Sequence, residues 1–206
     1  MSIRAVIFDL GGVVVGSPLH AIADYERRRG IPEGFINGVI GAAGSEGAWG
    51  RLERGVVDRE RFAQDFEAEC SEAGHAVAVL ELFAEMAEAS QPRPAMLQAI
   101  ARIRRQSLLT AALTNNFPDD SQGTGSLREH FDAFFESAVL GIHKPDPRIY
   151  QHACQELGIE AHEAVFLDDI GRNLKSARNL GMTTLKVDEP DAALRELESL
   201  LGFSLC

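Results

Sequence analysis

Cysteine is scarce in this chain, and the few thiols form no pattern. The 206 residues include three cysteines, Cys70, Cys154 and Cys206, which lie far apart and lack CxxC spacing. An odd number of scattered thiols argues against a disulfide framework and is typical of a protein kept in a reducing compartment. We therefore expect a cytoplasmic location without disulfides.

Basic residues and long apolar runs are lacking as well. Twenty Lys and Arg residues face 31 Asp and Glu residues, which gives a formal net charge of -11. Nucleic acid is not expected as a partner at this charge, because binding its backbone requires a basic face. No apolar run reaches the roughly 18 residues of a membrane-spanning helix, and Asp9 interrupts the apolar start, so no signal peptide is expected. We expect no membrane partner, and either a monomer or a homodimer.

The chain does contain the pattern of a parallel sheet. Short, continuous apolar runs suit buried strands with helices on both faces. Such runs, or weaker versions of them, predict strands over 4–9, 108–113, 137–140, 163–167 and 183–187. Amphipathic patterns between and after them predict helices over 94–105, 147–157, 173–180 and 191–201. This alternation predicts a doubly wound α/β fold with a mainly parallel, Rossmann-like sheet.

Residues 17–92 interrupt the alternation between the first two strands. This stretch contains almost only helix signals, and Pro- and Gly-containing linkers flank it. It is too long for a crossover and too helical for sheet. We expect an α-helical cap over 17–92, inserted into a core made of 1–16 and 93–206. The glycine-rich stretch 44–50 inside it is expected to be a flexible loop.

Polar residues follow the strands at four places, and they point to one site. They are Asp9, the pair Thr114 and Asn115, Lys144, and the pair Asp168 and Asp169. In an open parallel sheet, ligands bind at the carboxyl ends of the strands. Clustered carboxylates repel one another unless a cation lies among them, and hard oxygen ligands suit Mg²⁺. A metal, an ammonium group and hydrogen-bond donors around a carboxylate are what a phosphoryl group requires.

Four stretches make a family resemblance specific. In order they are VIFDLGGVV, LTNN, HKPDPRIY and VFLDDIGRNLKSARNLGM. Together they resemble the haloacid dehalogenase-like hydrolase superfamily over nearly the whole chain. Within it, they look most like the phosphatase domain at the N-terminus of soluble epoxide hydrolase and the related domain of acyl-CoA dehydrogenase fusions.

The resemblance implies a phosphohydrolase with a small phosphorylated metabolite or a lipid phosphate as substrate. Asp9 would be the nucleophile that forms an aspartyl-phosphate. Thr114 and Asn115 would bind phosphate oxygens, and Lys144 would bridge the nucleophile and the phosphoryl group, so that Asp9, Lys144 and Thr114 form the catalytic set. The cap would close over the site and select the substrate.

The resemblance also implies a Mg²⁺ site with one departure from the family pattern. Asp9, Asp169 and the backbone carbonyl of Gly11 would hold the metal, with Asp168 nearby or bound through water. The superfamily usually has an aspartate where this chain has Gly11, and that aspartate protonates the leaving group and then helps to activate water. Positioned acid–base groups typically contribute about 10² to 10⁴ in rate.

Gly11 leaves several functions open. The enzyme could be limited to good leaving groups, another residue such as one from the cap could supply the proton, or the site could bind phosphate ligands with little turnover. A metal-independent haloacid dehalogenase is a further alternative. The pair Asp168 and Asp169 argues against it, and so does the absence of a tyrosine at position 11.

Three other residues near these motifs have less specific interpretations. His143, next to Lys144, is interpreted as a solvated loop residue rather than a proton donor. Trp49 fits the cap core and a substrate loop equally well. Phe117 is expected in the core rather than against the substrate.

Overall fold

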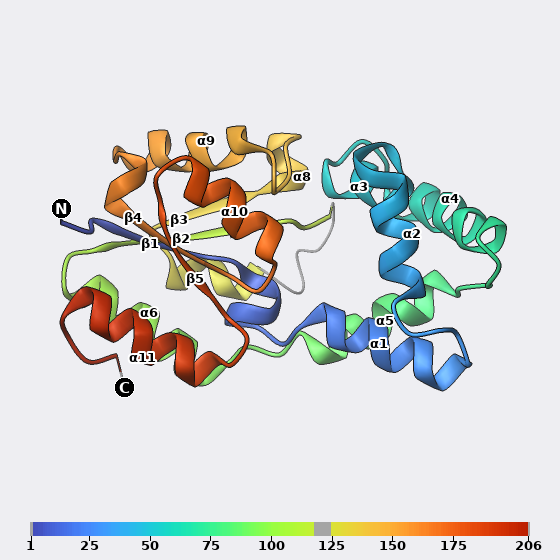
Figure 1. Ribbon diagram of the computed structural model, residues 1–206, viewed down its shortest axis with the longest axis horizontal. Helices are drawn as coiled ribbons and strands as arrows, with labels where there is room; N and C mark the ends of the chain where they lie inside the picture. Colours follow the sequence, from blue (N-terminus) through green and yellow to red (C-terminus); the bar gives the residue numbers. More distant parts are fainter. Residues whose placement is uncertain (1, 118–124, 206) are drawn as a thin grey trace.

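A single parallel sheet forms the centre of the computed structural model, which describes residues 2–117 and 125–205 (Figure 1). Its strand order is β3-β2-β1-β4-β5, and all neighbours run parallel. The strands are β1 (Ala5–Phe8), β2 (Leu109–Thr114), β3 (Ala133–Glu136), β4 (Ala164–Asp168) and β5 (Thr183–Lys186). This is the predicted Rossmann-like α/β fold, with β1 between the two strands whose ends carry most of the site.

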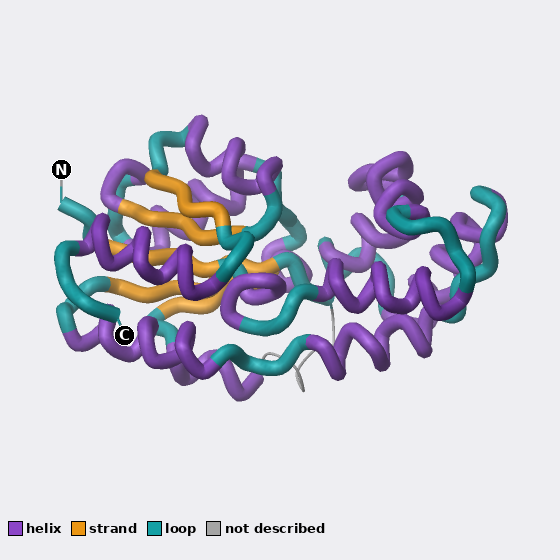
Figure 2. The backbone as a smooth tube through the Cα atoms, turned by 60° about the horizontal axis from the view of Figure 1, so that its bottom comes forward, coloured by secondary structure: helices purple, strands orange, loops and turns teal. Residues whose placement is uncertain are grey.

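Helices cover both faces of the sheet (Figures 1 and 2). On one face lie α6 (Pro94–Arg105), α11 (Pro190–Leu201) and the short η3 (Gly125–His130); on the other lie α8 (Ser137–Leu140), α9 (Pro147–Leu157) and α10 (Gly171–Asn179). The single turn η4 (Ala161–Glu163) precedes β4. Along β1, Val6 and Phe8 pack on the first face, while Ala5 and Ile7 pack on the second. The continuous apolar run of β1 is explained by this two-sided burial.

A separate group of helices, called here the helical bundle, lies between β1 and β2 in the sequence. It consists of α1 (Pro18–Arg29), α2 (Phe35–Ala43), α3 (Ala48–Glu53), α4 (Arg59–Glu72) and α5 (Val79–Ala89), with a short turn η2 (Gly44–Glu46) before α3. It has its own apolar cluster, in which the Trp49 ring lies edge-on to Phe62, Phe66 and Phe83. The bundle stands to one side of the sheet (Figure 1).

The structure differs from the sequence predictions at two elements. The strand expected over 137–140 is helix α8, and the strand of that region is β3, four residues earlier. Four small or apolar residues fit either structure, and here Ser137 bonds the loop after β2 instead of extending the strand. The loop expected over 44–50 contains η2 and the start of α3. Gly50 lies within α3, and a Cβ at this position would come 2.5 Å from the carbonyl oxygen of Ser45, which explains why glycine stands there.

None of the helices in the described part of the chain is both long enough and apolar enough to cross a lipid bilayer.

Candidate active site

The turn after β1 holds Asp9 in a fixed position. Asp9 Oδ1 accepts a hydrogen bond of 2.7 Å from the backbone N–H of Leu10. The turn, η1 (Leu10–Val14), is closed by the N–H of Val15, which donates to the carbonyl of Leu10 at 2.9 Å. From the far linker, the Arg93 guanidinium donates to the carbonyls of Gly12 and Val13 at 2.6 and 3.1 Å. The carboxylate is therefore placed by backbone geometry.

Gly12 is required by both the turn and the neighbouring loop. Its φ of 75° is the left-handed conformation that favours glycine. A Cβ at this position would overlap Oδ2 of Asp169. The backbone of the first turn and the carboxylate after β4 therefore approach each other as closely as they do only because residue 12 has no side chain.

Lys144 joins the two central strands through their carboxylates. Its Nζ lies 2.8 Å from Asp9 Oδ1 and 2.8 Å from Asp168 Oδ2, and the residue is only 2% exposed. Burial by itself lowers the pKa of Lys144, but the charges of Asp168 and Asp9 outweigh it, so that the pKa is raised. The ammonium group thus stays charged at neutral pH.

The pKa of Asp9 is raised well above its usual value. Burial is the main cause; Lys144 opposes it, and the charge of Asp168 adds to it. A second cation beside Asp9 would lower this pKa and favour the ionised form that a nucleophile needs.

Three carboxylates form a cluster at the carboxyl edge of the sheet. Asp9, Asp168 and Asp169 each offer an oxygen, and these oxygens all lie within 4.8 Å of one another. Burial, and then the charge of Asp168, raises the pKa of Asp169 to about 6. Three such oxygens close together fit a divalent ion that prefers hard ligands, such as Mg²⁺.

Within this cluster Asp168 differs from the other two. It is fully buried, and its oxygens accept hydrogen bonds from Lys144 Nζ, from the N–H of Ile170 at 2.7 Å and from Asn173 Nδ2 at 3.1 Å. Its lone pairs are therefore used by protein donors. Asp9 and Asp169 are the carboxylates better suited to direct metal contact, and Asp168 orients Lys144.

The loop after β2 is tied to the loop that carries Lys144. Thr114 is 4% exposed at the end of β2. The side chain of Asn115 accepts from the N–H of Lys144 at 2.8 Å and donates to its carbonyl at 3.0 Å. Because the Asn115 amide is used in this way, the backbone N–H of Asn115 and the hydroxyl of Thr114 are the candidate donors to a phosphate oxygen.

A proline ring packs against the position at which a side chain on residue 11 would begin. A Cβ added to Gly11 would lie 3.1 Å from Cδ and 3.2 Å from Cγ of Pro18, the first residue of α1. Ordinary Cβ contacts are longer than this, so a side chain at position 11 requires Pro18 to move by a few tenths of an ångström.

A large cavity opens between this edge of the sheet and the helical bundle. Its volume is about 1080 Å³, and Asp9, Gly11, Thr114, Asn115, Lys144 and Asp169 all line it. The bundle and the loop after β2 contribute apolar walls, namely Leu19, Ile22, Ile40, Trp49, Phe83, Met86 and Phe117. Trp49 therefore belongs to both the bundle core and the cavity wall, and Phe117 stacks on Phe83 at 5.2 Å.

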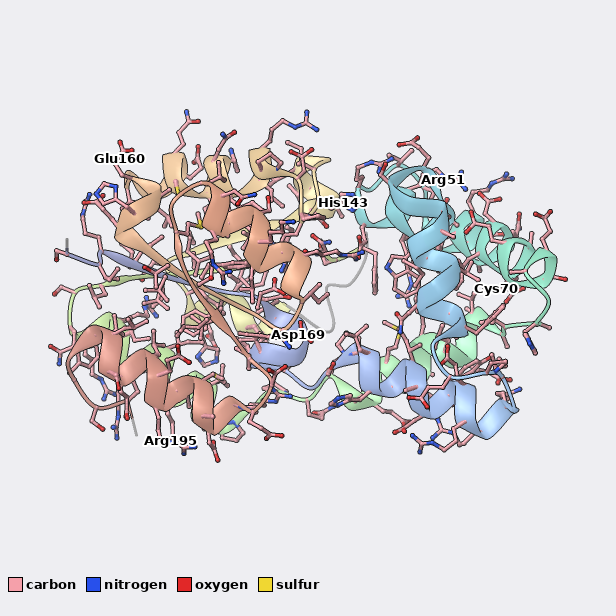
Figure 3. All side chains as sticks on the ribbon, in the orientation of Figure 1. Arg51, Cys70, His143, Glu160, Asp169 and Arg195 are labelled. Atoms are coloured by element: carbon pink, nitrogen blue, oxygen red, sulfur yellow. The ribbon has the colours of Figure 1, made fainter. Side chains whose placement is uncertain are left out.

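Sequence reasoning missed two residues of this cavity. His143 is not a solvated loop residue: its side chain is 18% exposed, and its Nδ1 lies 3.0 Å from Glu53 Oε2 at the end of α3. Figure 3 shows His143 on the side of the sheet that faces the helical bundle. Glu53 matches no motif, and the helix that carries it was expected to be partly loop. The only signal in the sequence is the apolar pair Trp49 and Leu52, which places Glu53 next to the buried side of a short helix.

Residues 3–181 match the family described as haloacid dehalogenase-like hydrolase. The chain belongs to this family. A solved family enzyme, bt-2542 from Bacteroides thetaiotaomicron in complex with magnesium and inorganic phosphate, has the same fold. It superposes with a TM-score of 0.67 at 20% identity, over 91% of this chain and 96% of that one. The chain is thus an enzyme of the hydrolase class.

Three relatives extend over nearly the whole chain. Mouse acyl-CoA dehydrogenase family member 10 is 44% identical over 99% of this chain and 20% of that protein. Pig bifunctional epoxide hydrolase 2 is 35% identical over 100% of this chain and 40% of that protein. The chain therefore spans less than half the length of either relative. The sesquiterpene phosphatase astK of Aspergillus oryzae is 28% identical over 97% of both chains.

Proposed function

We propose that this hydrolase is a Mg²⁺-dependent phosphohydrolase that cleaves a phosphate monoester through an aspartyl-phosphate at Asp9. The observation that carries the proposal is Lys144, whose Nζ lies 2.8 Å from both Asp9 and Asp168 beside the oxygen of Asp169. A buried ammonium between two carboxylates, next to a third, provides an anion-binding site around a nucleophile. The likeness to a protein named a phosphatase supports this class of reaction.

Each residue of the cluster has a proposed part in the metal site. Asp9, Asp169 and the backbone carbonyl of Gly11 would hold Mg²⁺, and Asp168 would stand next to it, bound through water or through Lys144 alone. Bound there, the ion would neutralise phosphate charge and keep the carboxylates ionised. The raised pKa values of Asp9 and Asp169 support a cation at this place, because each carboxylate is costly to ionise without one.

The reaction has two halves. In the first, an oxygen of Asp9 attacks phosphorus, the ester P–O bond breaks, and the leaving oxygen takes the electron pair. Lys144, the Thr114 hydroxyl and the Asn115 N–H hold the other phosphate oxygens. In the second, water attacks the same phosphorus, the bond to Asp9 breaks, and phosphate and the free carboxylate are released.

Gly11 limits the leaving groups that suit this site. It contributes no carboxyl group that could protonate the departing oxygen. Leaving groups that are stable as anions, such as aryl, acyl or anomeric oxygens, are therefore favoured over simple alkoxides. We propose that the enzyme prefers such esters.

The apolar side chains in the cavity wall support the proposal that the substrate has an apolar part. We propose that residues 17–92 act as the cap, and that the apolar side chains of the helical bundle contact the group attached to the phosphate. Leu19 lines the cavity and is 36% exposed, so a lipid or aryl group bound there would cover apolar surface that a sugar would leave in water. A lipid phosphate or an aryl phosphate fits better than a polar metabolite.

Hydrolysis of an aryl phosphate tests the proposal. With Mg²⁺ present, the wild-type protein should release phosphate, and both Asp9→Asn and removal of Mg²⁺ by EDTA should abolish the release. Equal rates in the wild-type protein and Asp9→Asn would overturn the proposal. Halide release that persists in EDTA would favour the dehalogenase alternative instead.

One observation supports a second candidate function. Gly11 contributes no acid to the cavity that it lines, and a Cβ there would lie 3.1 Å from the Pro18 ring, which also fits a phosphate-binding module with weak turnover. In that case phosphate esters would bind in a Mg²⁺-dependent way across a broad panel without being hydrolysed.

A further inference from the structure

We propose that Glu53 is a positioning residue that couples closure of the helical bundle to the phosphate-binding loops. The inference rests on the proposed function, because it assigns Glu53 a role in that reaction. Glu53 belongs to the helical bundle, but its carboxylate contacts the sheet and the helices that cover it, together called here the sheet domain. The contact lies at the edge of the sheet where the strands end.

One oxygen of Glu53 contacts two residues of the site loops. Oε2 lies 3.2 Å from Nδ2 of Asn115 and 3.0 Å from Nδ1 of His143. The same Asn115 side chain holds the backbone of Lys144, whose ammonium binds Asp9. A continuous series of contacts therefore runs from a bundle carboxylate through Asn115 and Lys144 to the nucleophile.

The helix that carries Glu53 is fixed within the bundle. The other carboxylate oxygen, Oε1, accepts from Nε1 of Trp49 at 3.2 Å. Trp49 lies edge-on to two aromatic rings of α4, and Leu52 is fully buried. Glu53 therefore cannot keep its contacts with Asn115 and His143 if the bundle moves away from the sheet domain.

A second contact lies next to the first. Gly55 packs so closely on α8 that a Cβ there would come 2.5 Å from the carbonyl oxygen of Ala138. Ser137 of α8 in turn accepts from the N–H of Asn116 at 3.0 Å. Both contacts therefore connect the helical bundle to the loop after β2, the first through Asn115 and the second through Ser137 and Asn116.

The two chain linkers between bundle and sheet domain lie elsewhere, at the paired segments of Val15 and Pro92. Figure 1 shows them at the end of the bundle away from α3 and α8. The cavity is lined both by these linker residues and by Glu53. The linkers suit a hinge, and Glu53 is placed to hold the opposite side closed.

Loss of the Glu53 carboxylate should remove one hydrogen-bond acceptor of the Asn115 amide. The amide should then hold the backbone of Lys144 less firmly. Because this effect concerns phosphate placement and not the leaving group, it should lower the rate equally for all esters. We expect Glu53→Ala to reduce kcat/KM by about 10- to 100-fold, the range typical of a lost hydrogen bond to a charged group. Glu53→Gln should recover part of the loss, since its carbonyl oxygen can still accept from Asn115.

The experiment compares these two variants with Glu60→Gln, a change of an exposed carboxylate on α4. Each is assayed on phosphate esters whose leaving groups range from aryl to alkyl, and thermal unfolding confirms that each is folded. A uniform loss in Glu53→Ala, partial recovery in Glu53→Gln and no loss in Glu60→Gln support the proposal. A loss confined to alkyl esters would make Glu53 a proton donor and would overturn the positioning role, as would full activity of Glu53→Ala.

Hydrogen exchange provides a readout that does not depend on turnover. In Glu53→Ala, peptides covering 109–117 and 141–146 should exchange faster than in the wild-type protein, while peptides of β4 should not change. Unchanged exchange in the first two segments would overturn the inference. If the wild-type protein hydrolyses no ester, the proposed function fails, and the exchange result still decides the role of Glu53.

Discussion

The ring of Pro18 stands 3.1 Å from the place where a side chain at Gly11 would begin. The first residue of the helical bundle thus packs against the position at which an acid would be attached. The chain has no carboxyl group at this position, and a side chain placed there would require Pro18 to move by a few tenths of an ångström.

This contact gives the first prediction. Gly11→Asp combined with Pro18→Ala should raise turnover of alkyl phosphates more than turnover of aryl phosphates, because only poor leaving groups need the added proton. Gly11→Asp alone should gain less, since Pro18 crowds the new side chain. Gly11→Asn with Pro18→Ala is the matched control without a proton. If the ratio of alkyl to aryl rates stays the same, another group supplies the proton.

A second prediction concerns Lys144, the cation between two carboxylates. Lys144→Met should abolish activity and lower the free energy of unfolding by about 3–5 kcal/mol, because it leaves Asp9 and Asp168 buried and uncompensated. The control is Lys186→Met, which removes an exposed pair with Asp188 and should change stability little. Urea unfolding measures both variants. A loss for Lys144→Met no larger than that of the control would contradict the charge balance described for the site.

The third prediction is a pH dependence of metal binding. The pKa of Asp169 is raised to about 6, so this carboxyl is mostly ionised at pH 7.5 and mostly protonated at pH 5. A metal must displace the proton, so the affinity for Mg²⁺ should fall as the pH drops through 6. Calorimetric titration with Mg²⁺ at several pH values measures this. An affinity that does not vary with pH would show that Asp169 is not a ligand.

Without bound metal, the raised pKa of Asp169 makes the folded state less stable as the pH rises, whereas Mg²⁺ binding becomes stronger. The pKa of Asp169 in the folded state lies above its ordinary value of 3.8, so proton uptake stabilises the folded state. This contribution is fully present below about pH 4 and is lost as the pH rises through 6. The raised pKa of Asp9 acts in the same direction. In EDTA, Asp169→Asn should therefore be more stable than the wild-type protein at pH 7.5 and should lose most of this advantage near pH 4.

A fourth prediction distinguishes two costs of a side chain at position 12: backbone strain and the steric clash with Asp169. Gly12 and Gly202 have φ values of 75° and 79°, but a Cβ meets Asp169 only at position 12 and meets nothing within 4 Å at position 202. Gly202→Ala should cost about 1–2 kcal/mol from conformation alone. Gly12→Ala should cost more and should also weaken Mg²⁺ binding. Equal costs and unchanged Mg²⁺ affinity would argue against the close approach of the turn to Asp169.

The sequence was sufficient to predict the parallel sheet, apart from the place of β3, and the residues that lie together at its edge. The runs of β1, β2 and β4 are continuous because both faces of these strands are buried, and short runs of this kind are typical of a covered parallel sheet. Because the strands are parallel, their carboxyl ends lie at the same edge of the sheet. This places Asp9, Thr114, Asp168 and Asp169 close together. The catalytic and metal-binding roles of these residues remain predictions.

The contacts between the bundle and the sheet domain could not be predicted in this way. Helix α3 has only six residues with a glycine in the middle, so its periodicity is too short to recognise. The pairing of Glu53 with Asn115 and His143 depends on how two units pack, and no local pattern encodes that. The strand misplaced onto α8 has the same cause, because tertiary contacts of Ser137 decided a four-residue segment.

The most direct test of the central claim is to identify the covalent intermediate. Enzyme mixed with an aryl phosphate and Mg²⁺ is quenched in acid within a turnover, digested and examined by mass spectrometry. We expect a phosphoryl group on the peptide that contains Asp9, located on that carboxylate, and none in Asp9→Asn. Steady turnover without any phosphorylated peptide, or with the phosphoryl group on another residue, would contradict the account.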